Sequence, residues 1–246
     1  MSVACWRRKV DRVALITGGS GALGGAIVRR FRQEGYSVAF TYRSGEKPAQ
    51  ALAEETGASA LRADLTKAEQ VGDAVRRVME QFGRIDVLVN NAGATQVMPF
   101  ALIEEEDWDV ILNGNLKTMF LVTREVARTM VAQRSGVIVN IGSLAGHRPM
   151  DVPVHYATAK AGVAGFTISL AKELSRYGVR VNSVVPGLLE DGVGRLVPEK
   201  ERAEYLRYCM AGRPGKTAEV AEVVAFLASE KAQYVNAQNI FVDGGI

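Results

Sequence analysis

The alternation of short apolar runs with longer amphipathic segments constrains the fold of this chain more than any other feature. Segments of helical period separate most of the apolar runs, for example 26–31, 71–82 and 163–174. Because parallel neighbours need a long return connection, this alternation predicts a parallel sheet with right-handed crossovers. We predict a doubly wound, Rossmann-type α/β fold with helices on both faces. The seven predicted strands are residues 13–16, 37–41, 58–61, 85–89, 136–141, 179–185 and 239–242.

Length and composition favour an ordinary globular protein. A chain of 246 residues that is 48% hydrophobic suits one domain, which we expect to span residues 1–246. The 30 basic and 27 acidic residues are interspersed, so no nucleic-acid or membrane patch is indicated. Cys5 and Cys209 lie far apart, and neither they nor the 2 histidines form a cluster, so we expect no disulfide and no metal site. The basic residues 1–9 precede no leader-like apolar run, and we expect a cytoplasmic protein.

In a doubly wound sheet, ligands bind beyond the carboxyl ends of the strands, so the residues after each strand are the candidate site. The first strand is followed by a glycine-rich turn that opens a helix. Glycines there remove the Cβ atoms that would hold a diphosphate away from backbone N–H groups. The turn therefore predicts dinucleotide binding, with Gly18, Ser20, Gly21, Leu23 and Gly24 as contacts.

The end of the second strand indicates which dinucleotide binds. Arg43 and Ser44 offer a guanidinium and a hydroxyl, which suit a ribose 2′-phosphate, whereas an acidic residue would accept from a 2′-hydroxyl. We predict NADPH/NADP+ over NADH, against the alternative that Arg43 is an ordinary solvated arginine.

Two further strand ends contribute candidates with structural alternatives. Asp64 and Leu65 would contact the adenine, unless Asp64 caps the helix that follows. Asn91, Ala92 and Gly93 form a turn that either touches a ribose or ties adjacent strand ends together.

Tyr156 and Lys160 are four residues apart in a predicted helix and so share one helix face. A phenol with an ordinary pKa of about 10 is a poor acid or base at neutral pH unless a nearby positive charge lowers that pKa. Lys160 is placed to supply that charge. Taken alone, the pair would better suit a solvated surface helix, and the motifs in the rest of the chain favour the chemical role.

These motifs, together with Asn115, Ser143 and the Pro186–Gly187 pair, occur in an order that resembles the short-chain dehydrogenase/reductase family, from Arg12 to the C-terminus. The resemblance implies that Tyr156 is the general acid for a carbonyl oxygen and that Ser143 orients the same oxygen. It also implies that Lys160 lowers the pKa of Tyr156 and holds the nicotinamide ribose. Asn115, in the long preceding helix, would carry a water-linked proton relay, and Pro186 and Gly187 would complete the cofactor site.

Two departures from the family pattern stand out. Ala22 occupies a position where relatives place glycine. After Gly187, the sequence has Leu188 and Leu189 where relatives commonly place a threonine near the nicotinamide amide. Either Asp191 takes the place of that hydroxyl or the loop is arranged differently.

The family places its substrate lid at about residues 190–213, which are rich in apolar side chains here. An apolar lid favours an acyl or aromatic ketone, although such stripes also suit core or subunit contacts. We expect the substrate pocket to include Ser143, His147, Met150, Tyr156 and Leu188, with Val152 and His155 facing the same cavity.

The whole pattern is most similar to the 3-oxoacyl-carrier-protein reductase subgroup. This resemblance implies NADPH-dependent reduction of a 3-oxoacyl thioester in fatty-acid or polyketide assembly, in a homotetramer built through two long helices and the C-terminal strand region. An acyl-carrier protein would dock on Arg128, Arg134 and Arg176, unless these are plain surface arginines. The alternatives are a ketoreductase for a free polycyclic, aromatic or steroid-like ketone, and a non-enzymatic NADP(H) sensor.

Overall fold

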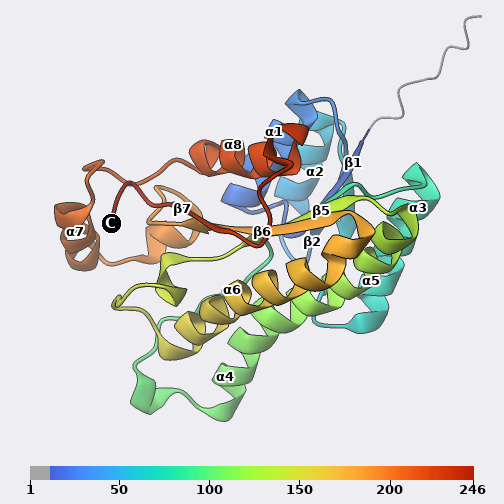
Figure 1. Ribbon diagram of the computed structural model, residues 1–246. Coiled ribbons are helices and arrows are strands. Elements are labelled where there is room, and N and C mark those ends of the chain that lie inside the picture. The colour runs from blue at the N-terminus through green and yellow to red at the C-terminus, as the bar shows by residue number, and fades with distance from the viewer. Residues whose placement is uncertain (1–11) are drawn as a thin grey trace, which may run out of the picture.

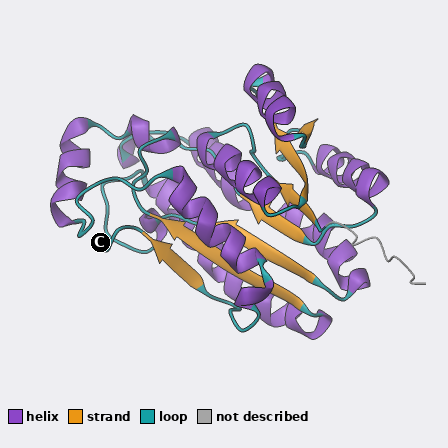
Figure 2. Cartoon of the chain, turned by 90° about the horizontal axis from the view of Figure 1, so that it is seen from above, coloured by secondary structure: helices purple, strands orange, loops and turns teal. Residues whose placement is uncertain are grey.

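The computed structural model describes residues 12–246, so Cys5 and the basic segment 1–9 lie outside the described residues. It contains one parallel seven-stranded sheet in the order β3-β2-β1-β4-β5-β6-β7, which confirms the predicted fold (Figures 1 and 2). Every predicted strand is present, with bounds that differ by at most two residues. The strands are β1 (Val13–Ile16), β2 (Ser37–Tyr42), β3 (Ser59–Arg62), β4 (Val87–Asn90), β5 (Gly136–Ile141), β6 (Val179–Pro186) and β7 (Asn239–Val242).

Helices cover both faces of the sheet, and the central strands β1, β4 and β5 are buried on both faces. Along β1, Ala14 and Ile16 pack on the side of α1, α2 and α8, while Val13 and Leu15 pack on the side of α3, α5 and α6 (Figure 1). The helices are α1 (Ala22–Gln33), α2 (Glu46–Thr56), α3 (Ala68–Phe82), α4 (Glu105–Leu112), α5 (Thr118–Gln133), α6 (Val154–Leu174), α7 (Glu199–Tyr208) and α8 (Thr217–Ala228).

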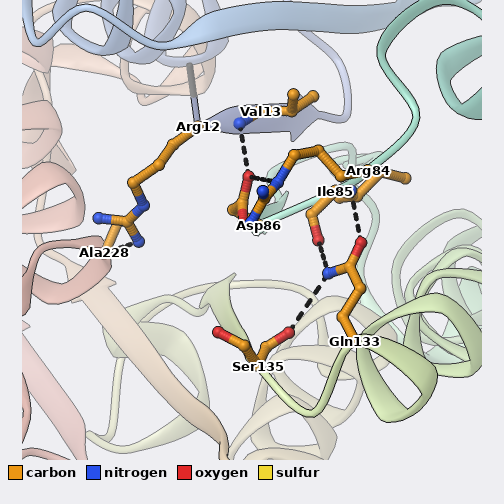
Figure 3. Close-up of polar contacts among 8 residues, drawn as sticks. All are labelled: Arg12, Val13, Arg84, Ile85, Asp86, Gln133, Ser135 and Ala228. Atoms are coloured by element: carbon orange, nitrogen blue, oxygen red, sulfur yellow. Dashed lines mark hydrogen bonds and ion pairs between the residues drawn. The ribbon is translucent and has the colours of Figure 1, made fainter. Parts of the chain in front are cut away.

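A network of polar contacts closes the amino end of the sheet (Figure 3). The buried Asp86 carboxylate accepts from the Val13 backbone N–H at 2.8 Å and from Arg84 Nε at 2.9 Å. Gln133 binds both backbone groups of Ile85, at 3.1 and 2.9 Å. These contacts fix β1 and β4 side by side, which sets the positions of the loops at their opposite, carboxyl ends.

Within residues 12–246, no helix has the length and apolar character needed to cross a membrane.

Candidate active site

A cavity of about 1100 Å³ opens beyond the carboxyl ends of the strands and is lined by residues of the strand ends and of α7. Its wall combines residues that follow all seven strands, as expected for a ligand site at the carboxyl ends of the strands. The predicted site residues that line it are Gly18, Ser20, Gly21, Leu23, Gly24, Arg43, Ser44, Asp64, Leu65, Asn91, Ala92, Gly93, Asn115, Ser143, Met150, Tyr156, Lys160, Pro186, Gly187 and Leu188.

The glycine turn after β1 forms a cradle that side chains would fill. A Cβ on Gly24 would lie 2.1 Å from the Gly18 carbonyl oxygen, and Gly18 itself has a φ of +67°. Asn91 Nδ2 donates to the carbonyl oxygens of Thr17 at 2.9 Å and Gly18 at 3.1 Å. Asn91 therefore ties the end of β4 to the turn, which is the structural alternative for this residue. The N-terminus of α1 and this open turn fit a diphosphate.

Ala22 is the first residue of α1 and lines the cavity. A Cβ added to Gly192, in the lid segment, would lie 3.5 Å from the Ala22 methyl group, at ordinary van der Waals distance. The extra methyl group of this chain therefore lies toward the lid.

At the far end of the cradle, Arg43 and Ser44 are exposed and line the cavity beyond β2. Asp64 Oδ1 accepts from the backbone N–H of Thr66 at 3.0 Å and from its hydroxyl at 2.7 Å. These bonds, with a smaller contribution from Arg43, lower the pKa of Asp64. The Asp64 carboxylate thus stabilises the turn before α3. This role is similar to the helix capping that was the structural alternative for Asp64.

Ser143 and Tyr156 meet because two elements pack at backbone contact. Ser143 follows β5 and precedes the 3-10 turn η3 (Leu144–Gly146), whereas Tyr156 lies in the first turns of α6. A Cβ on Gly146 would lie only 2.5 Å from the Ala161 nitrogen, so η3 rests directly on the backbone of α6. The result is that the Ser143 and Tyr156 side chains both line the cavity, with the serine hydroxyl close enough to influence the pKa of the phenol.

The electrostatics of this pair are set largely by burial. Burial raises the pKa of Tyr156, and the nearby Ser143 hydroxyl opposes only part of that effect. Lys160 Nζ lies 5.8 Å from the Tyr156 ring centroid and donates to the Ile141 carbonyl oxygen at 3.2 Å. Burial lowers the pKa of Lys160 to about 8. Burial dominates the pKa of both groups, and the lowering of the tyrosine pKa by Lys160 stays a prediction.

Asn115 lies in a π-helical turn, η2 (Asn113–Lys117), between α4 and α5, and not in a regular long helix as expected. Its Nδ2 donates to the Ala94 and Ile111 carbonyl oxygens at 2.8 and 2.9 Å. Its Oδ1 is buried without a partner among the described residues. A Cβ on Gly93 would lie 2.7 Å from this Oδ1 and 3.6 Å from Lys160 Nζ. Gly93 therefore keeps open the space between amide and ammonium that a water-linked relay needs.

Both histidines lie outside the cavity, contrary to prediction. His147 follows η3, and its ring packs edge-on against Phe241 of β7, with centroids 5.1 Å apart. His155 is fully buried, and its Nδ1 accepts from the Tyr156 backbone N–H at 3.0 Å. It satisfies one of the free N–H groups at the start of α6 and so has a structural contact there. Among residues 12–246, no cluster of His, Cys, Asp and Glu side chains is suited to a metal ion.

The predicted lid forms a 3-10 segment, η5 (Gly192–Leu196), followed by α7. Its cavity-facing side is more polar than expected, since Glu201, Glu204, Tyr205 and Tyr208 all line the cavity. The Tyr205 hydroxyl accepts from the Leu188 N–H and donates to the Asp243 carbonyl oxygen, both at 3.1 Å.

Asp191, the candidate replacement for the family threonine, forms an ion pair with Arg195 four residues later. The carboxylate lines the cavity, but one of its oxygens is already engaged within the lid.

The proposed docking arginines do not form one face beside the cavity. An Arg134 Nη2 donates to the Arg176 carbonyl oxygen at 3.4 Å, and these two residues precede β5 and β6, at the amino end of the sheet. Arg128 is paired with Glu125 at 2.9 Å on α5. The cavity opens at the opposite, carboxyl end.

Sequence reasoning missed Gly146, Tyr205 and Glu201, which the structure places at the site. The only sequence signal for Gly146 was a glycine close to Ser143. The two α7 residues are four apart, a spacing that identifies a shared helix face once the lid helix is known.

Comparisons with known proteins agree with this geometry. A family model described as enoyl-(acyl carrier protein) reductase matches residues 19–246. A 3-oxoacyl-(acyl-carrier-protein) reductase of Thermotoga maritima is 41% identical over 245 residues, covering 97% of this chain and 99% of that protein. The reductase of the same name from Staphylococcus epidermidis is 36% identical over 242 residues, covering 96% and 99%.

Two solved structures are also similar. The crystal structure of gox2181 has a TM-score of 0.91 and 34% identity over 95% of both chains. A double mutant of a Serratia marcescens short-chain dehydrogenase/reductase has a TM-score of 0.89 and 32% identity, covering 96% of this chain and 98% of that one.

Proposed function

The chain belongs to the short-chain dehydrogenase/reductase family, whose members are oxidoreductases that use a nicotinamide cofactor; from this premise we propose that it reduces a 3-oxoacyl thioester to the 3-hydroxyacyl thioester with NADPH. The observation that carries the proposal is that Ser143 and Tyr156 lie together in the wall of the cavity, with the buried Lys160 one helix turn from Tyr156. We also propose that residues 12–246 act as one domain with a lid at about 190–213.

The residues of this chain fit the steps of carbonyl reduction. A carbonyl oxygen against Ser143 and Tyr156 receives two hydrogen bonds, and Tyr156 gives its proton to that oxygen as negative charge develops. Lys160 stabilises the resulting phenolate, and the free Oδ1 of Asn115 holds a water through which the site regains its proton. When bound in the glycine cradle, the nicotinamide cofactor supplies the hydride.

This pair favours a ketone over an enoyl substrate, although the matching family model carries an enoyl reductase description. Two hydroxyl groups that converge on one point suit a single oxygen that becomes an alcohol. Reduction of a carbon–carbon double bond leaves the carbonyl oxygen as a carbonyl, so the oxygen needs no lasting proton from Tyr156. The names of the Thermotoga and Staphylococcus relatives support the same choice.

The test is a substrate panel with the purified full chain, followed by loss of NADPH absorbance. We expect turnover of acetoacetyl-carrier protein and of the acetoacetyl N-acetylcysteamine thioester, and little with the crotonyl thioester or a decalone. A decalone or aromatic ketone reduced faster than both acetoacetyl substrates would replace this function with the free-ketone alternative. NADPH binding without turnover of any ketone would favour the sensor.

NADPH preference rests on Arg43, which lies at the cavity wall beyond β2 with no acidic residue at that strand end. A charge-assisted hydrogen bond to a 2′-phosphate contributes about 1.5 to 3 kcal/mol, so Arg43→Ala should raise the Kd for NADPH about 10- to 150-fold. Its Kd for NADH should stay near the wild-type value. Equal increases in the Kd values for NADPH and NADH, measured by titration calorimetry, would show that Arg43 does not bind the 2′-phosphate.

A carrier protein is the proposed donor of the acyl chain, since the relatives are named for carrier-bound substrates. The chain carries a net charge of +3, so its association with an acidic carrier should weaken as ionic strength rises. The KM for acetoacetyl-carrier protein should therefore rise with salt, while the KM for the small thioester should not.

A further inference from the structure

The lid is attached to the rest of the molecule through few contacts. The segments at its two ends pair with each other, since the Glu190 N–H donates to the Gly215 carbonyl oxygen and the Gly215 N–H donates to the Leu188 carbonyl oxygen, both at 2.9 Å. After α7, the Ala211 N–H donates to the Gly244 carbonyl oxygen at 2.9 Å. The lid helix α7 lies between these points, beside the C-terminal end of the chain, and needs an attachment of its own (Figure 1).

Tyr205 provides that attachment. Its side chain is 9% exposed and packs in a small apolar cluster with Leu144 and Val185. Its hydroxyl accepts from the Leu188 N–H and donates to the Asp243 carbonyl oxygen, both at 3.1 Å. Among residues 12–246, no other side chain of α7 forms a hydrogen bond or an ion pair outside the helix. The hydroxyl of Tyr205 therefore joins α7 to the segments that follow β6 and β7.

The same hydroxyl lies against the backbone of the cavity wall. A Cβ on Gly187 would clash with the Tyr205 hydroxyl and would lie 2.8 Å from Asp243 Cα. The Gly187 N–H donates to the Val242 carbonyl oxygen at 3.0 Å. Residues 186–188, which line the cavity, are thus held between the end of β7 and Tyr205. The lid helix cannot lift from the cavity without breaking the bond to the Leu188 N–H.

The amino end of the lid lies beside the glycine cradle. A Cβ on Gly192 would be 3.5 Å from the Ala22 methyl group at the start of α1. Within residues 12–246, no hydrogen bond joins the lid segment 191–197 to the cradle, so this contact is one of van der Waals type only. The closed position of the lid beside the cofactor cradle therefore depends on the bonds of Tyr205.

We infer that Tyr205 is a positioning residue whose hydroxyl holds the lid helix closed and fixes residues 186–188, and that it thereby slows the release of the nicotinamide cofactor. The inference rests on the proposed function only in taking NADPH as that cofactor, and not on the choice of substrate. The hydroxyl acts through the backbone of Leu188 and Asp243. Two net hydrogen bonds shift the equilibrium between a closed and an open lid by about 5- to 150-fold.

The experiment measures the displacement of bound NADPH by excess NADP+ in stopped-flow fluorescence, with the full chain. Tyr205→Phe keeps the buried ring and removes only the hydroxyl. Its dissociation rate constant for NADPH should rise about 5- to 150-fold, together with the KM for NADPH, whereas kcat with the acetoacetyl thioester at saturating NADPH should not fall. A tyrosine with only a structural role would lower the free energy of unfolding and leave this rate constant unchanged.

Tyr177→Phe is the matched control. Tyr177 lies in the 3-10 turn η4 (Ser175–Tyr177) before β6, at the end of the sheet away from the cavity, and its hydroxyl has no hydrogen-bond partner in the described part of the chain. This variant also loses a single phenol hydroxyl and should keep the wild-type rate constant. An equal increase in both variants would overturn the inference.

A second measurement uses the cofactor-free wild type and needs no variant. The Leu188 amide should exchange its hydrogen slowly, because only opening of the lid releases it from the buried Tyr205 hydroxyl. Fast exchange of this amide, or an unchanged NADPH dissociation rate constant in Tyr205→Phe, would overturn the inference. Absence of thioester turnover together with the expected change in NADPH dissociation would overturn the proposed function and support this inference.

Discussion

At the residue scale, the buried Lys160 lowers the stability of the fold, although the proposed reaction needs its ammonium group. Its ammonium is 7% exposed and donates to one carbonyl oxygen, at 3.2 Å. Burial lowers its pKa from 10.5 to about 8. Since the folded pKa lies below the unfolded value, the unfolded chain binds the proton more tightly, and the lysine destabilises the fold below pH 8 by about 3 kcal/mol.

Replacing Lys160 with methionine should therefore stabilise the protein while abolishing turnover. The unfolding free energy of Lys160→Met at pH 7 should exceed that of the wild type by up to about 3 kcal/mol, measured by urea denaturation. The wild type should gain stability as pH rises from about 8 to 10.5, so the difference should shrink over that range. A methionine variant less stable than the wild type at pH 7 would contradict this account.

Tyr156 carries the second prediction at this scale. Tyr156→Phe removes only the phenol hydroxyl from the cavity wall, so cofactor binding should persist while kcat falls about 100- to 10,000-fold. The measurements are steady-state NADPH oxidation with the acetoacetyl thioester and calorimetric titration of NADPH. A phenylalanine enzyme with near wild-type turnover would remove Tyr156 from the proposed chemistry.

At the element scale, the meeting of η3 with α6 decides whether the catalytic groups converge. The sequence predicted the residues on both elements but not how close the elements are, because a glycine reveals a backbone contact only when the neighbouring backbone is known. Gly146 lies against Ala161, and Gly93 lies between Asn115 and Lys160 in the same way. The sequence also did not predict the π-helical turn that holds Asn115. One extra residue in a single turn hardly changes the spacing of hydrophobic residues along a helix.

Gly146→Ala tests that contact. The new methyl group would meet the Ala161 nitrogen at 2.5 Å and the Lys160 carbonyl carbon at 2.6 Å, and a backbone cannot move aside as a flexible side chain can. Separation of η3 from α6 should lower kcat about 10- to 100-fold, since small misplacements of catalytic groups have effects of that order. Gly72→Ala in α3 is the control, because its Cβ would meet no atom within 4 Å. It should leave kcat unchanged and raise stability by about 1 kcal/mol.

At the scale of the whole molecule, the sequence predicted the sheet and most of the cavity wall, because both follow from strand order and from residues next to strand ends. It failed where position depends on packing between segments distant in sequence. His147 contacts Phe241 of β7, and Arg134 lies beside Arg176 at the end of the sheet away from the cavity. The polar face of α7 was hidden for the same reason, since the composition of the lid does not say which side of its helix faces inward.

Exposed apolar side chains on the outer helices and on β7 predict that the protein is a homotetramer. Phe120 on α5 and Ile168 on α6 are 46% and 50% exposed, on helices that lie side by side in the outer layer (Figure 1). Phe226 on α8 and Phe241 on β7 are similarly exposed. The molecule therefore has two separate apolar faces suited to subunit contacts, one on α5 and α6 and one on α8 and β7. Two isologous faces of this kind generate a closed assembly of four copies, with a mass four times 26.5 kDa. Ile168→Glu, which buries a charge in one face, should yield dimers in light-scattering chromatography, whereas Lys47→Glu on the remote α2 should not. A wild-type monomer at micromolar concentration would contradict the assembly.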